Sequence, residues 1–299
     1  MSRPDPRVTV VVPTRNVIRT IRACLASVRA QDYPGVELVV VDNASTDGTF
    51  EVAVELADLA VRGGPERSAQ RNRGVELASG DFVLWIDSDM VLAPDVVRLA
   101  VRTARDSGAV AVSVPEVSIG PGFWTACRAL ERCCYQDDPA LANPRLLDRA
   151  YLAGLGGFDT TMSGPEDTDL RLRLRAADAP VAYCSGALIW HDEGRLTFRS
   201  IVAKRVYYGR SLPSFAAAHP GALRQQGAGT VRAFVRHRRR LLGDPAHFAG
   251  LVVMRLAEAA AYGLGAWLGR RDRRQPARPG PAGGGGGGGG DGRGAVSDR

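Results

Sequence analysis

The stretch Phe82-Val83-Leu84-Trp85-Ile86-Asp87-Ser88-Asp89 is the best guide to the fold of this chain. Its first five residues are a continuous apolar run, which is typical of a strand buried on both faces. The run ends in two carboxylates separated by one residue, where such a strand leaves the sheet. Hard oxygen ligands in that position suit Mg²⁺ or Mn²⁺ shared with a diphosphate. A turn or helix-cap role also remains open for both, so their meaning depends on what else reaches this sheet edge.

Strand patterns and amphipathic helix patterns alternate on both sides of this stretch. Val8–Val12 and Val36–Val41 are further apolar strands, and residues 59–61 and 109–114 form shorter ones. Asn16 is expected to cap the first helix. Further helices are expected over residues 47–59, over residues 68–78 with Gly80 as the C-cap, and from Pro94 onward. This alternation predicts an α/β fold in which helices cover both faces of a mostly parallel sheet.

The second half of the chain is less regular. Helices are expected over residues 123–135, 163–177 and 196–209, and short strands over 181–183 and 187–190. We expect a catalytic domain over residues 1–210, with a first half over 8–115 and a second over 116–210. A helical extension over 211–268 and a disordered Gly/Arg-rich tail over 269–299 follow.

An apolar segment, residues 247–268, is long enough to cross a membrane. Arg255 and Glu258 near its centre oppose free spanning, but at a spacing of three residues they can pair on the polar face of an interfacial helix. The cationic run Arg236–Arg240 lies just upstream. Peripheral attachment to an anionic membrane surface is therefore the favoured alternative. Packing against the catalytic domain and a dimer contact remain open.

Composition places the chain among ordinary soluble proteins. The formal net charge is +7, but the seven arginines and three aspartates after Leu268 supply +4 of it, so nucleic acid is not expected as a partner. Five scattered cysteines form no metal-type pair, and residues 1–7 show no signal peptide. These features predict reduced thiols and a cytoplasmic location.

Several carboxylates and one histidine follow the expected strands. Asp42 comes directly after a strand and too early to cap the next helix. Asp167 lies three residues before Leu170, which makes it either an anchored cap or an inward-facing catalytic base. Ser163 and Glu166 fit a capping box. His191 follows an apolar run and is either structural or a metal ligand. In parallel sheets, such strand ends meet where ligands bind.

Six motifs occur together in a recognisable order. They are Val11-Val12-Pro13-Thr14-Arg15-Asn16, Val40-Val41-Asp42-Asn43-Ala44-Ser45-Thr46-Asp47-Gly48-Thr49, Gln70-Arg71-Asn72-Arg73-Gly74, Asp87-Ser88-Asp89, Gly156-Gly157-Phe158-Asp159 and Gly164-Pro165-Glu166-Asp167-Thr168-Asp169-Leu170. Over residues 8–209 the chain resembles the inverting glycosyltransferase family 2. The resemblance implies a GT-A fold, which is a Rossmann-like sheet that binds nucleotide-diphospho-sugars, and a hexosyltransferase-type enzyme.

The resemblance also implies roles for individual residues. Pro13 and Thr14 would line the base pocket, and Asp42 would hydrogen-bond the base. Asp87 would face the ribose and the metal, whereas Asp89, completed by His191, would bind a divalent cation, Mn²⁺ or Mg²⁺. Arg71 would lie near the nucleotide and Lys204, the only lysine, near the diphosphate; a solvated helix position remains open for both.

The chemistry of transfer selects Asp167 as the base. An acceptor hydroxyl must lose its proton while the nucleoside diphosphate leaves from the opposite face, which predicts inversion. A UDP-sugar is the expected donor. Lipid-linked sugars, cell-envelope glycans and small natural products remain open as acceptors. Because no Gln-x-x-Arg-Trp motif and no set of membrane helices follow, a single addition is expected rather than processive synthesis.

Pro165 departs from the family pattern, which often has glycine directly before Glu-Asp, so the geometry of the acceptor-side loop is open. Two other functions are weighed. A nucleotidyltransferase of this fold normally has a Gly-rich basic loop after its first strand, and Pro13-Thr14-Arg15-Asn16 does not provide one. A non-catalytic protein that binds nucleotide sugars would have no reason to keep four aspartates together, namely Asp42, Asp87, Asp89 and Asp167.

Overall fold

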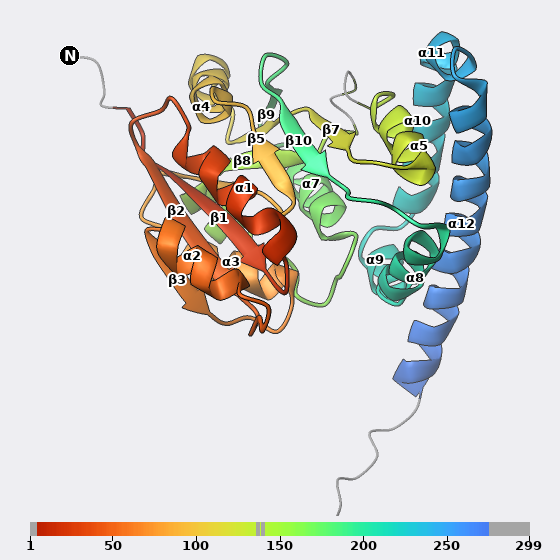
Figure 1. Cartoon of the computed structure of the whole chain (residues 1–299), viewed down its shortest axis with the longest axis horizontal. Coiled ribbons are helices and arrows are strands. Elements are labelled where there is room, and N and C mark those ends of the chain that lie inside the picture. Colours follow the sequence, from red (N-terminus) through yellow and green to blue (C-terminus); the bar gives the residue numbers. More distant parts are fainter. Residues whose placement is uncertain (1–4, 136–137, 139–140, 275–299) are drawn as a thin grey trace, which may run out of the picture.

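The centre of the fold is a seven-stranded sheet with the order β3-β2-β1-β4-β8-β6-β9 (Figure 1). The computed structural model describes residues 5–135, 138 and 141–274. The strands are β1 (Val8–Thr14), β2 (Val36–Asp42), β3 (Leu59–Arg62), β4 (Phe82–Trp85), β6 (Ala111–Ser113), β8 (Pro144–Asp148) and β9 (Val181–Tyr183). Neighbouring strands are parallel except around β8, which runs antiparallel to both β4 and β6. The expected mostly parallel sheet is confirmed.

Helices cover both faces of this sheet, as expected. On one face α1 (Ile18–Arg29), α2 (Thr49–Leu56) and α4 (Val96–Ser107) bury their apolar sides. On the other face lie α3 (Arg67–Leu77), α6 (Arg149–Gly154) and α7 (Glu166–Ala176). Successive strand residues point to opposite faces of the sheet. Val10 and Val12 therefore pack in the core on the side of α1, α2 and α4, and Val11 packs on the side of α3. This two-sided burial explains why β1, β2 and β4 are mostly apolar.

A second, three-stranded sheet was not expected from the sequence. It consists of β5 (Met90–Leu92), β10 (Ile189–Asp192) and β7 (Glu116–Ile119). In its register His191 lies opposite Met90 on one side and Ser118 on the other. The small sheet therefore carries His191 next to the residues that follow β4.

Three predicted helix caps are wrong. Asn16 has a left-handed φ of 51°, and its side chain accepts a hydrogen bond from the backbone N–H of Thr46, while Val17 is the N-cap of α1. Helix α3 ends at Leu77 with Ala78 as its C-cap, and the predicted C-cap Gly80 instead packs closely against β1. Helix α7 begins only at Glu166, with Pro165 at the N-cap, so the Ser163–Glu166 capping box is absent. Proline locks φ at a helix start and displaces the expected cap.

The remaining helices form a block beside the sheets. They are α5 (Phe123–Arg132), α8 (Phe198–Gly209), α9 (Leu212–Ala218), α10 (Ala222–Arg236), α11 (Arg238–Leu242) and α12 (Pro245–Arg274). Helix α12 runs along the outer edge of the molecule and packs against α5 and α8 (Figure 1). By length and composition it is the one helix, among the residues the structure describes, that could cross a membrane. Helix α12 continues through residues 269–274 of the predicted tail, and residues 275–299 lie outside the described residues.

The contact between α8 and α12 is unusually close at Gly209 and Gly265. A β-carbon added at Gly265 would meet the backbone carbonyl oxygen of Val206, and one added at Gly209 would lie 2.7 Å from that of Tyr262. The two helix backbones therefore touch without an intervening side chain.

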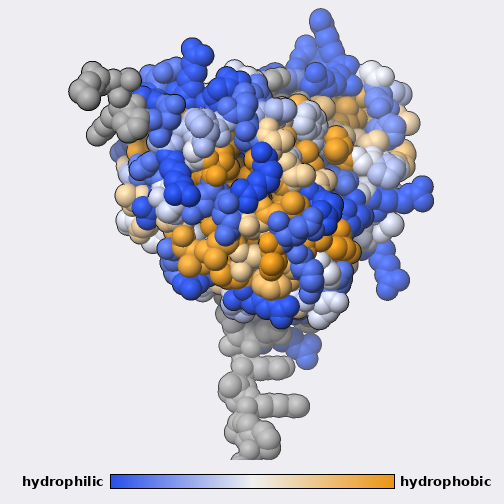
Figure 2. Space-filling model, turned by 60° about the vertical axis from the view of Figure 1, so that its left-hand side comes forward, coloured by the Kyte–Doolittle hydropathy of each residue, from blue (hydrophilic) through white to orange (hydrophobic). Residues whose placement is uncertain are grey.

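On the face of the molecule shown in Figure 2, apolar side chains are interspersed with hydrophilic ones.

Candidate active site

A cleft of about 990 Å³ opens between the carboxyl ends of the central strands and the helical block. Seven of the predicted site residues line it: Pro13, Thr14, Asp87, Asp89, Asp167, His191 and Lys204. They come from β1, the segment after β4, the first turn of α7, β10 and α8. Side chains that are far apart in the sequence thus share one cavity at the sheet edge where ligands bind in folds of this kind.

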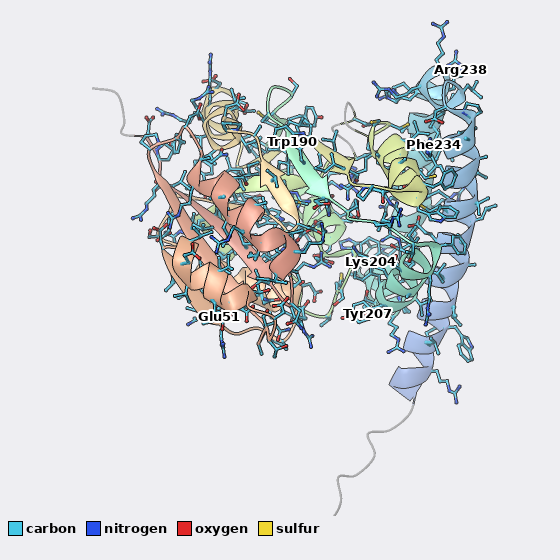
Figure 3. The ribbon with its side chains drawn as sticks, viewed as in Figure 1. Glu51, Trp190, Lys204, Tyr207, Phe234 and Arg238 are labelled. Atoms are coloured by element: carbon cyan, nitrogen blue, oxygen red, sulfur yellow. The ribbon has the colours of Figure 1, made fainter. Side chains whose placement is uncertain are left out.

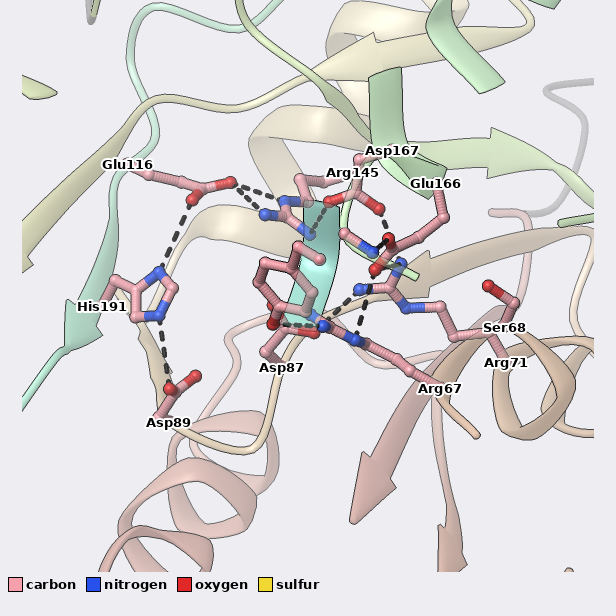
Figure 4. Close-up of polar contacts among 12 residues, drawn as sticks. Arg67, Ser68, Arg71, Asp87, Asp89, Glu116, Arg145, Glu166, Asp167 and His191 are labelled. Carbon is pink, nitrogen blue, oxygen red and sulfur yellow. Dashed lines mark hydrogen bonds and ion pairs between the residues drawn. The ribbon is translucent and has the colours of Figure 1, made fainter. Parts of the chain in front are cut away.

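Arg71 lies beneath this cleft and joins its two sides. Its guanidinium is fully buried and donates to Asp87 Oδ1 at 2.7 Å and to Asp167 Oδ1 at 2.6 Å (Figure 4). The ring of Phe158 lies 5.2 Å from the guanidinium carbon. Arg71 does not line the cleft, so this geometry does not support its predicted contact with a nucleotide. It fixes the position of Asp87 relative to Asp167 instead.

Arg67 adds a second cation on the same side. It lies 3.7 Å from Asp87 and 3.2 Å from Glu166, and it donates to the Tyr208 hydroxyl at 2.8 Å. Burial alone would raise the pKa of Asp87, but Arg71 and Arg67 outweigh burial and hold that pKa well below its usual range. Asp87 is therefore an ionised carboxylate at neutral pH. Burial dominates at Glu166 and raises its pKa.

Glu116 and Arg145 belong to the site although the sequence did not reveal them. Arg145, from β8, donates to Glu116 of β7 at 2.6 Å and lies 3.6 Å from the second oxygen of Asp167. Arg132 donates to Glu116 at 2.8 Å. Although burial would raise the pKa of Glu116, these arginines and His191 lower it strongly. Asp167 consequently lies between two buried guanidinium groups, those of Arg71 and Arg145.

The side chains of Asp89 and His191 face each other where β10 borders the cleft. His191 Nε2 is 3.3 Å from Asp89 Oδ2, and His191 Nδ1 is 3.9 Å from Glu116 (Figure 4). Burial would lower the pKa of His191, but the neighbouring carboxylates of Asp89 and Glu116 raise it to about 9. At neutral pH the His191 ring is therefore protonated, and a metal ion would have to displace a ring proton before the imidazole could act as a ligand.

The residues present fit a divalent cation that is shared with a substrate. Asp89 Oδ1 is buried and has no hydrogen-bond partner in the structure. No group of three or more His, Cys, Asp or Glu side chains in the described part of the chain is arranged to hold a metal. Asp89 and His191 would therefore supply two ligands, and diphosphate oxygens and water the rest. Mg²⁺ commonly binds in this way, through one or two carboxylates together with substrate phosphates.

Asp42 is fully buried and does not reach the cleft. Its carboxylate accepts hydrogen bonds from Thr14 Oγ1 at 2.8 Å and from both the N–H and the hydroxyl of Ser45. This position does not support the predicted contact between Asp42 and a base. The contact with Thr14, which does line the cleft, means that Asp42 orients a wall of the predicted base pocket.

Lys204 projects from α8 on the side that faces the sheets (Figure 3). It lines the cleft, and its ammonium group lies 5.9 Å from the centre of the Tyr208 ring. Tyr208 in turn packs over Gly164, where an added β-carbon would lie 2.6 Å from the tyrosine ring. Gly164 has a φ of 103°, so the loop before Asp167 needs glycine both for its backbone and for this contact.

Comparison with known proteins shows which family the first half of the chain resembles. The family model described as glycosyl transferase family 2 matches residues 9–154. Over these residues, about half of its length, the chain is similar to glycosyl transferase family 2. The matched region contains Asp42, Arg71, Asp87 and Asp89 and ends before Asp167, so the base assignment rests on the resemblance and on the geometry described above.

Individual relatives agree with this assignment. Glycosyltransferase GlyA of Streptococcus pneumoniae is 36% identical over 100 residues, covering 31% of this chain and 14% of that protein. The pre-mycofactocin glycosyltransferase of Mycobacterium tuberculosis is 27% identical over 252 residues, covering 71% of this chain and 48% of that protein. The chain thus spans less than half the length of these two curated relatives.

A solved structure confirms the expected GT-A fold. The Pyrobaculum calidifontis mannosyltransferase PcManGT, in complex with GDP-Man and Mn²⁺, is 25% identical to this chain with a TM-score of 0.54. The match covers 88% of this chain and 80% of that one. The similarity therefore extends past the matched family region into the helical block.

Proposed function

We propose that this chain transfers one sugar from a nucleoside-diphosphate sugar to an acceptor hydroxyl, with inversion at the anomeric carbon and with the help of Mn²⁺ or Mg²⁺. The observation that carries the proposal is the bridge through Arg71. One buried guanidinium holds Asp87 of the metal side and Asp167 of the opposite wall within a single cleft. A donor bound near Asp87 and Asp89 would thus lie within reach of a carboxylate that can take a proton.

The donor would occupy the part of the cleft between β1 and β10. Pro13 and Thr14 would flank the base, and Asp87 would accept a hydrogen bond from a ribose hydroxyl because it remains ionised at neutral pH. A divalent cation between Asp89, His191 and the diphosphate would neutralise charge that develops on the leaving group. Lys204 would approach the same diphosphate from α8. The P. calidifontis relative, solved with GDP-Man and Mn²⁺, supports this donor class and metal.

The acceptor would enter from the helical block. Asp167 keeps one oxygen against Arg71 and has the other 3.6 Å from Arg145, which positions the carboxylate at the edge of the cleft. It would take the proton of the attacking hydroxyl, while the nucleoside diphosphate leaves on the opposite face. UDP-sugars are the first donors to test and GDP-sugars the second.

The decisive experiment is the substitution Asp167→Asn, which preserves size and removes the basic oxygen. Turnover of the donor, measured as release of nucleoside diphosphate with or without an acceptor panel, is expected to fall by about 10²–10⁴-fold. Donor binding measured by calorimetry in the presence of Mn²⁺ is expected to be retained. Asp106→Asn, at an exposed position on α4, is the matched control.

Turnover that survives in Asp167→Asn with unchanged donor binding would remove Asp167 from the mechanism. The anomeric configuration of the product, read by NMR, tests inversion separately. Mass spectrometry of the product tests single addition, since a processive enzyme would give a ladder of masses.

A further inference from the structure

The side of α12 that faces away from the molecule is apolar along most of its length. The exposed large side chains on it are 44% to 68% exposed: Val252, Val253, Leu256, Leu264 and Trp267. Every exposed residue of α12 from Ala249 to Trp267 is apolar or glycine. These positions recur at the spacing of one helix face. Over this range the stripe is about 27 Å long, and Figure 1 shows that α12 itself lies at the outer edge of the described structure.

The two charged residues in the middle of the same helix, Arg255 and Glu258, form ion pairs within the protein. Glu258 is buried, and it accepts hydrogen bonds from Arg128 of α5 and Arg205 of α8. Arg255 lies 3.1 Å from Glu258 and 3.4 Å from Glu131. To span a bilayer, α12 would have to leave these partners and carry both charges into lipid, which is costly. The helix therefore stays on the protein and presents only its outer face.

Exposed arginines flank both ends of the stripe. Arg238 and Arg239 lie in α11, directly before α12 begins (Figure 3), and Arg270 and Arg271 follow Trp267. Self-association through this face would bring arginines against arginines, whether the two copies of α12 run parallel or antiparallel. An anionic surface, by contrast, complements both ends. A contiguous exposed apolar stripe with such flanks is the pattern of an interfacial helix.

We propose that the outer face of α12 lies on the surface of an anionic phospholipid membrane, with Leu256 and Trp267 in the interface and the flanking arginines on the headgroups. This surface is separate from the cleft and does not depend on the transfer reaction. The membrane would hold the protein through the same helix that packs against α8, which carries Lys204.

The test uses the full chain and flotation with vesicles of phosphatidylcholine, with or without phosphatidylglycerol. The unsubstituted protein is expected to float with anionic vesicles. Leu256→Ser combined with Trp267→Ser should lower the partition coefficient at least about tenfold, because two interfacial side chains are lost. Arg270→Glu with Arg271→Glu should lower binding to anionic vesicles and have little effect with phosphatidylcholine. Val54→Ser, at a position on α2 that is 59% exposed, is the matched control and should float like the unsubstituted protein.

Tryptophan fluorescence gives a second readout that does not require a destabilising change. Emission should shift to shorter wavelength on addition of anionic vesicles, and Trp267→Phe should remove most of that shift while flotation persists. Failure of the unsubstituted protein to float, or equal flotation of all variants, overturns the proposal. A dimer in solution that Leu256→Ser/Trp267→Ser converts to a monomer, without lipid binding, would assign the face to a second copy. Resistance to a carbonate wash would show a spanning helix and overturn the proposal as well.

Discussion

Replacing Arg71 with methionine removes a cation that contacts both Asp87 and Asp167. The methionine side chain fills much of the same volume but provides no hydrogen-bond donor. Because Arg71 is fully buried, water does not replace the lost interactions. Two carboxylates that were held by hydrogen bonds of 2.7 Å and 2.6 Å then share a poorly solvated space.

The expected cost follows from the partners that remain. Removal of one partner from a buried ion pair usually costs about 3–5 kcal/mol. Arg67 stays 3.7 Å from Asp87, and Arg145 stays 3.6 Å from Asp167, so the loss should lie at the lower end, about 3 kcal/mol. For a chain of this size that corresponds to a fall in Tm of about 5 °C.

The effect of pH has a definite sign. In the folded protein the pKa of Asp87 is held well below its usual range, since Arg71 and Arg67 outweigh burial. The ionised carboxylate therefore contributes stability that is fully present above its unfolded pKa of about 3.9 and is lost as the pH falls through the lower folded pKa. Without Arg71, fewer cations oppose the effect of burial, so the pKa of Asp87 moves upward. The Tm difference between the two proteins should thus be constant near neutrality and shrink as the pH falls through the higher Asp87 pKa of the variant toward the lower one of the unsubstituted protein.

The assay is thermal unfolding followed by circular dichroism at several pH values from neutral to acidic. Arg73→Met is the matched control, because Arg73 lies on the same helix and pairs with Glu76 only at the surface; it should change stability by less than about 1 kcal/mol. Arg71→Lys should recover part of the loss, since one ammonium group cannot hold two carboxylates with the geometry of a guanidinium. If Arg71→Met and Arg73→Met had equal Tm values at neutral pH, the ion pairs of Arg71 with Asp87 and Asp167 would make no measurable contribution to the stability of the fold.

Two further predictions concern the metal and the outer helix. Asp89→Ala should abolish the Mn²⁺ dependence of donor binding in calorimetry, because the chain would then offer only His191 to the cation; full retention of that dependence would refute the assignment. Gly265→Ala should destabilise the chain by about 1–3 kcal/mol in thermal unfolding, since its β-carbon would meet the backbone of α8. Gly263→Ala, two residues earlier in open space, should instead stabilise it by up to about 1 kcal/mol, and equal effects at the two positions would contradict the close packing.

The parallel part of the sheet could be predicted because its strands are buried on both faces. Strands β1, β2 and β4 are mostly apolar, and this composition alone predicts buried strands. Strand β8 carries a proline and an arginine in five residues, and β5 has only three residues, so neither shows a pattern longer than chance. These short strands are defined by their neighbours in space rather than by their own sequence.

The same difference explains which site residues were found. The aspartates stand in motifs directly after predicted strands, whereas Glu116 and Arg145 are 29 positions apart and meet only through β7 and β8. One signal was available: Arg145 precedes Leu146 and Leu147, and an arginine beside fully buried apolar residues needs a partner. The motif located Arg71 but could not show that the side chain points beneath the cleft toward two carboxylates.

The contact between Gly209 and Gly265 determines how much of the chain acts as one mechanical unit. Because no side chain separates the backbones of α8 and α12 at this contact, we expect the two helices to move as one rigid unit. Gly269 extends this joint, because an added β-carbon there would meet the carbonyl oxygen of Arg210. Lys204 and Tyr208 lie on α8 within two turns of the joint. A chain cut at residue 210, where the catalytic domain was expected to end, would leave this wall of the cleft without its support.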